Sequence, residues 1–170
     1  MINLNKVRII AEAGVNHNGE ISLALELIEV AAKAGADIIK FQTFDTDNLV
    51  THYSRKASYQ IKNLNNSKDQ TQREMLKKFE LKYSDYNLLL EKCEQLNIEF
   101  LSTGFDIKSL DFINNLGLKR HKIPSGEITN LPYLRFVGTQ NKPIILSTGM
   151  ANISEIKEAL DILNISGAKS

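Results

Sequence analysis

The feature that most constrains the fold is an alternation of short apolar segments with longer segments of helical periodicity. Short runs rich in Ile, Val, Leu and Phe are typical of strands buried on both faces of a parallel sheet. The expected strands are Val7–Ala11, Asp37–Phe41, Ile98–Leu101, Arg120–Ile123 and Pro143–Leu146. The fourth run is polar, unlike the others, and is the least typical strand of the set.

The segments between and after these strands place apolar residues three and four positions apart, which predicts amphipathic helices. The four stripes are Ala24, Leu27, Ile28 and Ala31; Tyr86, Leu89, Leu90 and Cys93; Leu110, Ile113 and Leu116; and Ile156, Leu160 and Leu163. Gly35 is the expected stop of the first helix and Ser84 the expected N-cap of the second. Asn152 and Glu155 have capping-box spacing. Because Cys93 lies on an apolar stripe, we expect it to serve packing rather than chemistry.

Repeated strand–helix units predict a parallel α/β sheet, either a doubly wound open sheet or a (β/α)8 barrel. The first strand runs into Ala-Glu-Ala-Gly-Val-Asn-His-Asn-Gly, which does not match the G-x-G-x-x-G pattern of dinucleotide-binding folds. The sequence also contains no phosphate-binding P-loop pattern. A nucleotide-binding role therefore has no support from a motif.

Composition and charge exclude several classes of protein. With 21 Lys and Arg against 20 Asp and Glu, the net charge is +1, which predicts neither a nucleic-acid footprint nor a polybasic membrane patch. The apolar runs are too short to cross a bilayer, and the first residues do not follow a signal-peptide plan. A single cysteine excludes a disulfide framework and a cysteine-rich zinc site, and it favours a cytoplasmic location.

Polar residues follow each expected strand at its C-terminal end, where parallel α/β folds bind ligands. In chain order they are Glu12, Asn16 and His17; Lys40 and Gln42; Ser102, Thr103 and Asp106; Lys122, Ser125, Gly126 and Glu127; and Ser147, Thr148 and Gly149. Lysines, hydroxyls and glycine-rich turns suit a phosphate or a phosphorylated carboxylate. Glu12 and Glu127 suit proton transfer or the binding of sugar hydroxyls.

Lys40 and Lys122 leave a second chemistry open. A desolvated lysine inside a barrel can form a Schiff base with a carbonyl substrate, so a lysine-dependent aldolase is an alternative. The polar excursion from Asp45 to Asn66 is either a substrate-binding loop or a surface insertion, with Met75, Leu76 and Phe79 in a helical piece after it.

The three histidines, His17, His52 and His121, match no metal-binding spacing. We expect His17 to structure the loop after the first strand. His121 alternates with Lys122, so the two side chains are expected on opposite faces of their strand.

Several segments resemble motifs of the sialic acid synthases, a family that includes N-acetylneuraminate, legionaminate and pseudaminate synthases. The matching segments are, in order, Ile9–Gly19, Lys40–Phe44, Lys56–Gln60, Lys122–Glu127 and Leu146–Met150. One further motif, Ser102–Asp106, has Gly104 where the family commonly has proline, a difference that we expect to affect backbone rigidity alone.

The resemblance implies condensation of phosphoenolpyruvate with an N-acetylated aldose, typically N-acetylmannosamine, to a nine-carbon sialic acid with release of phosphate. It also implies a divalent cation, Mn²⁺ or Mg²⁺, and a homodimer of the complete enzyme. Glu12 is then the catalytic carboxylate. The residues implied to hold phosphoenolpyruvate are Lys40, Thr103, Lys122, Ser125 and Ser147, and those implied to contact the sugar are Gln42 and Glu127. Tyr59 and Gln60 are further candidates on the sugar side.

The family fold is a TIM barrel followed by a small antifreeze-like domain. A complete (β/α)8 barrel needs about 250 residues, so we expect residues 1–170 to be its N-terminal portion, with about five βα units present. The family's metal-binding histidines and an arginine that reaches the partner subunit's site lie beyond this portion. An open part-barrel is expected to expose apolar edges and to be inactive alone, and a chain that only binds a ligand or a partner is a further alternative.

Overall fold

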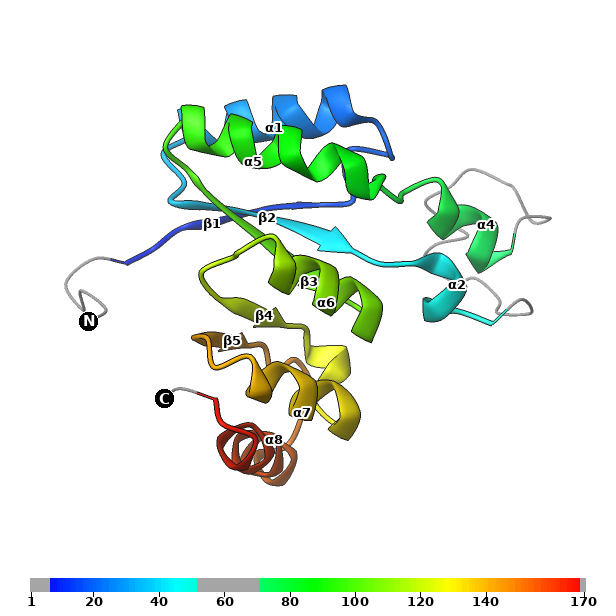
Figure 1. The fold of residues 1–170 in the computed structure, drawn as a ribbon, viewed down its shortest axis with the longest axis vertical. Helices are drawn as coiled ribbons and strands as arrows, with labels where there is room; N and C mark the ends of the chain where they lie inside the picture. The colour runs from blue at the N-terminus through cyan, green and yellow to red at the C-terminus, as the bar shows by residue number, and fades with distance from the viewer. Residues whose placement is uncertain (1–6, 52–70, 169–170) are drawn as a thin grey trace.

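The computed structural model describes residues 7–51 and 71–168 (Figure 1). Strands β1 (Ile10–Gly14), β2 (Ile38–Thr43) and β3 (Glu99–Gly104) form a parallel sheet in that order. Strands β4 (His121–Ile123) and β5 (Ile144–Leu146) form a second parallel pair. The two sheets adjoin, because Arg120 Nε donates to Glu99 Oε1 at 2.7 Å. The predicted parallel α/β architecture is confirmed, and the arrangement is consistent with part of a barrel.

Helices follow the strands in the expected alternation. The longer ones are α1 (Ile21–Lys33), α5 (Tyr86–Gln95), α6 (Ile107–Asn115), α7 (Leu131–Thr139) and α8 (Ile153–Ile165). The shorter elements are α2 (Thr46–Leu49), α4 (Gln72–Lys77) and the 3-10 turns η1 (Tyr83–Asp85) and η2 (Ser125–Glu127). In Figure 1, α1 and α5 lie side by side over the first sheet, α7 and α8 lie beside β5, and α2 and α4 lie beyond the C-terminal end of β2.

The first strand begins later than predicted, at Ile10 rather than Val7. Pairing with β2 sets its limits, since Ile10 is the first residue paired with that strand, opposite Ile38. The preceding Ile9 accepts from the backbone N–H groups of Asp37 and Ile38, and its own N–H donates to Asp37 Oδ2 at 2.9 Å. Val7 is 83% exposed, so its apolar side chain lies outside the core. As a result Glu12 lies within the strand instead of following it.

Helix starts were predicted with mixed success. The Asn152–Glu155 capping box is present. Ser84 is not the N-cap of α5, because it lies in η1 and its hydroxyl donates to Asp85 Oδ1 at 3.2 Å. Helix α7 was not predicted at all. Its signals are the Asn130 side chain, which accepts from Tyr133 N, and a proline in its first turn.

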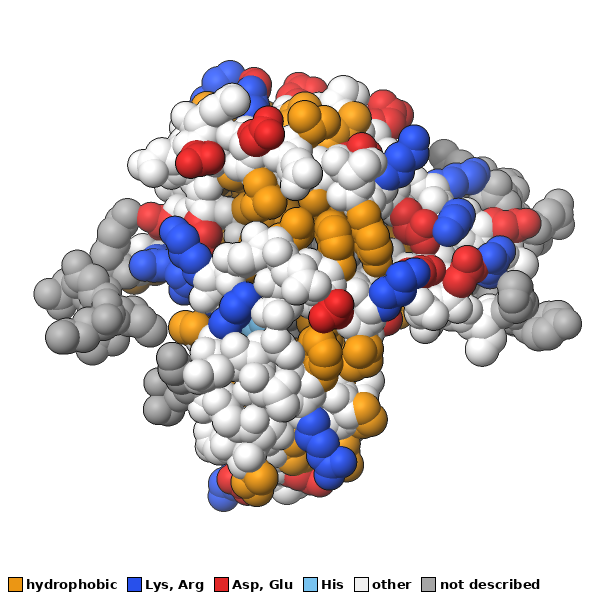
Figure 2. Space-filling view, in the orientation of Figure 1, with side chains coloured by type: hydrophobic (Ala, Val, Ile, Leu, Met, Phe, Trp, Pro, Cys, Tyr) orange, Lys and Arg blue, Asp and Glu red, His pale blue; other side chains and the backbone are white. Residues whose placement is uncertain are grey.

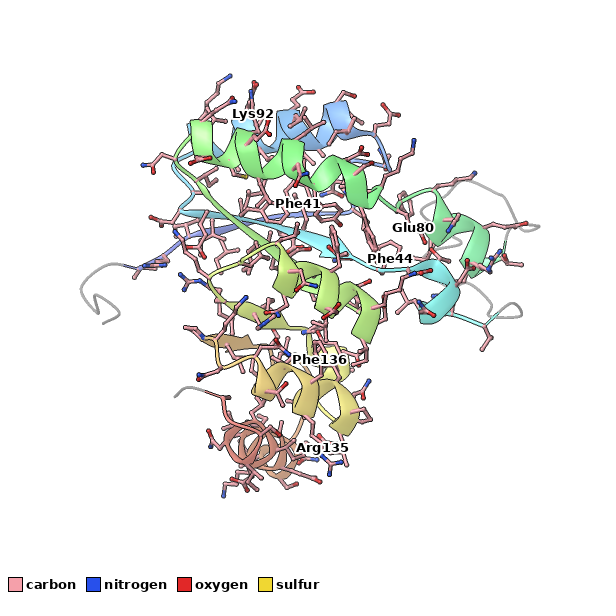
Figure 3. The ribbon with its side chains drawn as sticks, in the orientation of Figure 1. Phe41, Phe44, Glu80, Lys92, Arg135 and Phe136 are labelled. Carbon is pink, nitrogen blue, oxygen red and sulfur yellow. The ribbon has the colours of Figure 1, made fainter. Side chains whose placement is uncertain are left out.

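The apolar core has two parts. One lies between the first sheet and helices α1 and α5, where Phe41 stacks on Phe100 at a ring separation of 5.5 Å. Figure 3 shows Phe41 between β2 and α5. Cys93 is buried in this part, which confirms its packing role, and burial raises the pKa of its thiol to about 12. The second part lies beneath α7 and α8 and contains Ile123, Leu134 and Val137 among others.

Apolar surface remains exposed at the margins, as expected of an open part-barrel. In the described parts of the chain, β1 and β5 each have a single hydrogen-bonded neighbour, and Ile9 beside β1 is exposed. Ile153 and Leu160 of α8 are also exposed. In Figure 2 apolar side chains reach the surface in the band between α5 and α6 as well. Within the described residues, no helix is long and apolar enough to cross a membrane.

Candidate active site

The candidate site lies on the face of the first sheet that points away from α1 and α5, called here the inner face. Strand β2 alternates across the sheet: Ile39 and Phe41 belong to the core under the helices, so Lys40 and Gln42 point to the inner face. The register places Glu12 of β1 opposite Lys40, and Thr103 of β3 opposite Gln42. Three neighbouring strands therefore bring predicted site residues to one surface.

Glu12 and Lys40 form an ion pair across β1 and β2. Lys40 Nζ lies 2.5 Å from Glu12 Oε2, with 12% of the lysine side chain exposed and 51% of the glutamate side chain. The lysine is therefore held inside the site, while about half of the glutamate side chain is exposed and accessible to a ligand.

Gly14 sits between Glu12 and Gln42. A Cβ built on Gly14 would lie 3.3 Å from Glu12 Oε1 and 3.7 Å from Gln42 Nε2, and its φ is +54°. The pairing of β1 with β2 shifts register between Glu12 and Gly14, so the strand bends at this point. The backbone approach allowed by glycine keeps the carboxylate and the amide close together.

Lys122 of β4 joins the same electrostatic environment. Burial is the main cause that lowers the pKa of Lys122, the nearby charge of Lys40 lowers it further, and Glu12 opposes the shift. Lys122 Nζ also donates to the carbonyl of Ile123 at 2.8 Å. The charges of two ammonium groups and one carboxylate thus act on one another here, and the excess of positive charge suits an anionic ligand.

Thr103 adds a hydroxyl to this face. Its side chain is buried, and its Oγ1 has no hydrogen-bond partner within the described residues. A buried hydroxyl without a partner is costly, so a ligand that accepts or donates a hydrogen bond here would gain from it.

Ser125 and Ser147 lie at the C-terminal ends of β4 and β5. Ser147 N donates to the carbonyl of Ile123 at 3.1 Å, which continues the β4–β5 pairing. A Cβ on Gly149 would lie 2.7 Å from Ser125 Oγ, so Ser125 packs directly on the backbone after β5. The two serines therefore belong to one corner of the structure.

Glu127 follows β4 in the 3-10 turn η2, and its Oε2 accepts from Asn130 Nδ2, the N-cap of α7, at 2.7 Å. Within residues 7–51 and 71–168, no hydrogen bond or ion pair connects it to Glu12, Lys40 or Lys122. Strand register and charge place Glu12, Lys40, Gln42, Thr103 and Lys122 on one surface, and a place for Glu127 in the same site stays a prediction.

Comparison with known proteins identifies the family of the chain. Residues 27–170 match the NeuB family. The chain belongs to the NeuB family. It is 53% identical over 166 residues to N,N'-diacetyllegionaminic acid synthase of Campylobacter jejuni, covering 98% of this chain and 49% of that protein. It is 54% identical over 153 residues to the synthase of the same name from Legionella pneumophila, covering 90% of this chain and 42% of that protein.

A solved NeuB-type structure confirms the fold. The N-acetylneuraminic acid synthetase of Leptospira borgpetersenii, solved in complex with citrate, superposes with a TM-score of 0.77 at 32% identity, over 96% of this chain and 52% of that chain. The chain therefore spans about half the length of the curated relatives it matches. The expected membership of the sialic acid synthase family is confirmed.

This NeuB chain offers no metal centre in the part that the structure describes: no three His, Cys, Asp or Glu residues are grouped to hold an ion. His52, Tyr59 and Gln60 lie outside the described residues. His17 structures its loop as expected, because its Nδ1 accepts from Gly19 N at 3.0 Å, and burial lowers its pKa. His121 is buried, on the face of β4 opposite Lys122.

The described start of the polar excursion, residues 45–51, contacts other parts of the molecule. Asp45 Oδ2 lies 2.9 Å from Lys108 Nζ, and Asp47 pairs with Arg73. Thr46 N donates to Glu80 Oε1 at 2.6 Å, and Figure 3 shows Glu80 near the junction of β2 and α2. A substrate-binding role for this excursion stays a prediction.

A wide hollow of about 970 Å³ lies at the opposite end of the sheet, lined by Arg8, Asp37 and Glu99 among others. These residues mark the N-terminal ends of β2 and β3. Ligands of parallel α/β folds bind at the C-terminal ends, so we place the candidate site at the Glu12 and Lys40 cluster instead.

Sequence reasoning missed Thr43 and Tyr86 as residues that support the site from behind, and it expected Ser102 among the ligand-facing residues, whereas Ser102 points toward the helices and contacts Thr43. Thr43 Oγ1 lies 2.8 Å from Tyr86 OH and 2.7 Å from Ser102 Oγ, and all three side chains are buried. The available signal was a hydroxyl residue at the end of each of two neighbouring strands, on the face that should have been wholly apolar.

Proposed function

We propose that the protein condenses phosphoenolpyruvate with an N-acetylated sugar to a sialic acid-type product and releases phosphate. The observation that carries the proposal is the inner-face cluster in which Lys40 pairs with Glu12 and the charges of both residues act on Lys122. Phosphoenolpyruvate has a phosphate and a carboxylate, so a site for it needs more positive than negative charge together with hydrogen-bond donors. Membership of the NeuB family supports the same reaction.

Each residue has a proposed role. Lys40 and Lys122 neutralise the two anionic groups of phosphoenolpyruvate, with hydrogen bonds from Thr103, Ser125 and Ser147. These three hydroxyls lie at the C-terminal ends of β3, β4 and β5.

In the reaction, C3 of phosphoenolpyruvate attacks the aldehyde carbon of the open-chain sugar. Water then adds at C2, and phosphate leaves from the tetrahedral intermediate. Glu12 has about half of its side chain exposed and pairs with Lys40. It orients or deprotonates a group in these steps and favours positive charge that develops at C2.

The proposed acceptor follows from the relatives. The two synthases at 53% and 54% identity are named for a product with two N-acetyl groups, whereas the human N-acetylneuraminate-9-phosphate synthase is 30% identical. We therefore propose a diacetamido sugar as the acceptor, with N-acetylmannosamine as the second candidate. Gln42, on the inner face with Glu12, is the proposed sugar contact, and Glu127 contributes from η2.

A requirement for Mn²⁺ or Mg²⁺ and a homodimeric assembly are part of the proposal as well. The described residues supply no metal centre, so this part rests on the family resemblance alone. Loss of turnover in EDTA that either ion restores, together with a dimer mass by light scattering, is the expected result.

The test uses the full-length protein encoded by the gene. We expect phosphate release from phosphoenolpyruvate only when an acceptor sugar is present, faster with the diacetamido sugar than with N-acetylmannosamine, and a product mass equal to the condensation product. Glu12→Gln and Lys40→Ala should abolish turnover. The matched controls are Glu29→Gln and Lys92→Ala, because Lys92 Nζ and Glu29 Oε1 form an equally close pair at 2.5 Å on the helical layer (Figure 3).

Sugar-independent phosphate release, or parental turnover by Glu12→Gln and Lys40→Ala, would refute this function. The Schiff-base aldolase is tested in parallel, because the lowered pKa of Lys122 is also what an amine nucleophile needs. Borohydride with pyruvate should leave Lys40 and Lys122 unlabelled if the proposal is correct. Binding of phosphoenolpyruvate without turnover by the full-length protein would favour a purely binding role.

A further inference from the structure

Three hydroxyl side chains form a continuous hydrogen-bonded chain behind the inner face. Tyr86 OH lies 2.8 Å from Thr43 Oγ1, which in turn lies 2.7 Å from Ser102 Oγ. The three side chains are between 1% and 2% exposed. Polar groups are rarely buried among apolar side chains unless their hydrogen bonds are satisfied, so this chain is a specific arrangement rather than a chance contact.

The chain lies directly behind two residues of the candidate site. Thr43 follows Gln42 in β2, and Ser102 precedes Thr103 in β3. Because side chains alternate along a strand, Thr43 and Ser102 point toward the helices while Gln42 and Thr103 point to the inner face. Fixing the two outward side chains to each other therefore fixes the backbone from which the two site residues project.

Tyr86 anchors this link to the helical layer. It is the first residue of α5, and its ring meets Phe112 edge-on at 4.9 Å and Phe100 at 6.2 Å. These contacts hold the ring, so the hydroxyl group has a fixed position. Burial raises the pKa of Tyr86, which keeps its proton available for hydrogen bonding.

We propose that the Tyr86–Thr43–Ser102 hydroxyl chain is a positioning device for the site residues Gln42 and Thr103. This inference rests on the proposed function, because positioning has meaning only for a site that binds and turns over a substrate. The hydroxyls touch no substrate themselves. They set the distance and orientation of two groups that do.

The test removes the central hydroxyl while keeping its shape. In the full-length protein, Thr43→Val should lower kcat for phosphate release about tenfold or more, with a smaller change in KM, because misplacement of groups around the reacting atoms costs rate. Thr43→Ser keeps the hydroxyl and should stay within about twofold of the parent. Tyr86→Phe removes one of the two hydrogen bonds and should give an intermediate kcat.

The matched control is Tyr83→Phe. Tyr83 stacks on Phe112 at 4.0 Å, but its hydroxyl is outside the chain and lies 3.5 Å from Ser109 Oγ. This variant should keep the parental kcat and KM. All rates are measured well below the unfolding temperature, with the folded fraction checked by circular dichroism, so that lost stability is not read as lost positioning.

The outcomes separate the two proposals. A folded Thr43→Val variant with parental kcat and KM refutes the positioning role and leaves the proposed function standing, and so does an equal loss of kcat in Tyr83→Phe. If Thr43→Val does not fold, Tyr86→Phe decides in the same way. A parent protein that releases no phosphate refutes the proposed function, and the positioning role falls with it.

Discussion

Gly19 lies against the backbone of Lys78, so close that a Cβ on Gly19 would overlap the Lys78 carbonyl oxygen. Gly19 ends the loop that follows β1, and Lys78 is the C-cap of α4, nearly sixty residues later in the chain. The contact therefore docks the loop that contains His17 onto the segment that returns from the polar excursion. Its φ of +79° also favours glycine over any other residue.

We predict that Gly19→Ala destabilises the protein by roughly 2–4 kcal/mol, because it adds overlap with the backbone to strain at positive φ. The measurement is equilibrium unfolding in urea. Gly35→Ala is the matched control, since Gly35 has a φ of +81° and nothing within 4 Å of a built Cβ. That control should lose about 1 kcal/mol of stability, because it adds only backbone strain at positive φ. Equal losses in the two variants would contradict the proposed contact.

The strands that bear the candidate site could be predicted from the sequence more fully than the contacts around them. Lys40, Gln42 and Lys122 could be placed on β2 and β4 because the order of apolar strands and the polar residues at their ends depend on local pattern alone, whereas their roles stay predictions. Their convergence follows from the rule that parallel strands share one C-terminal edge. Glu127 follows its strand less directly, since it ends the 3-10 turn η2 after β4 and contacts Asn130, the N-cap of α7.

Other features depend on contacts between distant residues, which local pattern does not show. The predicted first strand begins too early because Val7 and Ile9 are apolar. Pairing with β2, which local pattern does not show, determines where the strand begins. The sequence pattern places Thr43 at the polar end of a strand. Its hydrogen bonds with Tyr86 and Ser102 depend on tertiary contacts that the pattern does not show. The same holds for Gly19 and Lys78.

Gly104 corrects an expectation about backbone rigidity. A Cβ there would lie 3.0 Å from Leu110 N and 3.2 Å from Ile113 Cδ1, so the residue packs tightly against α6. Its carbonyl also accepts from Tyr133 OH at 2.6 Å. Gly104→Ala should therefore destabilise the protein by roughly 1–3 kcal/mol through overpacking, as measured by urea unfolding. A gain in stability, as expected if only unfolded-chain freedom mattered, would contradict the packing argument.

Lys122 is predicted to destabilise the folded protein. Its pKa is lowered in the folded state, mainly by burial and then by Lys40, so the folded protein binds its proton less readily than the unfolded chain does. The resulting loss in the free energy of unfolding is greatest below the folded pKa of Lys122. It disappears as the pH rises toward the ordinary pKa of lysine. Lys122→Met should raise the midpoint of urea unfolding at pH 7 while lowering phosphate release at least a hundredfold. An unchanged or lower midpoint would contradict this prediction.

His121 is predicted to make the protein sensitive to acid. Burial lowers the pKa of His121 to about 4, with a smaller contribution from the charge of Lys142. Above the ordinary histidine pKa of about 6.5, the side chain is neutral in both states and has no effect. As pH falls below that value the unfolded chain takes up a proton first, so the free energy of unfolding decreases until the folded state is protonated near pH 4. The total loss is about 3 kcal/mol.

The measurement is the urea midpoint of the parent and of His121→Gln at intervals from pH 7 to pH 4. Gln keeps a polar side chain of similar size but has no proton to gain, so the variant should lose less stability with acid than the parent does. The difference between the two curves isolates His121 from the carboxylates, which titrate in both proteins. Its expected slope is at most about 1.4 kcal/mol per pH unit, confined to the range between about pH 6.5 and pH 4. Parallel curves across that range would show that His121 takes up its proton equally well in the folded and unfolded states.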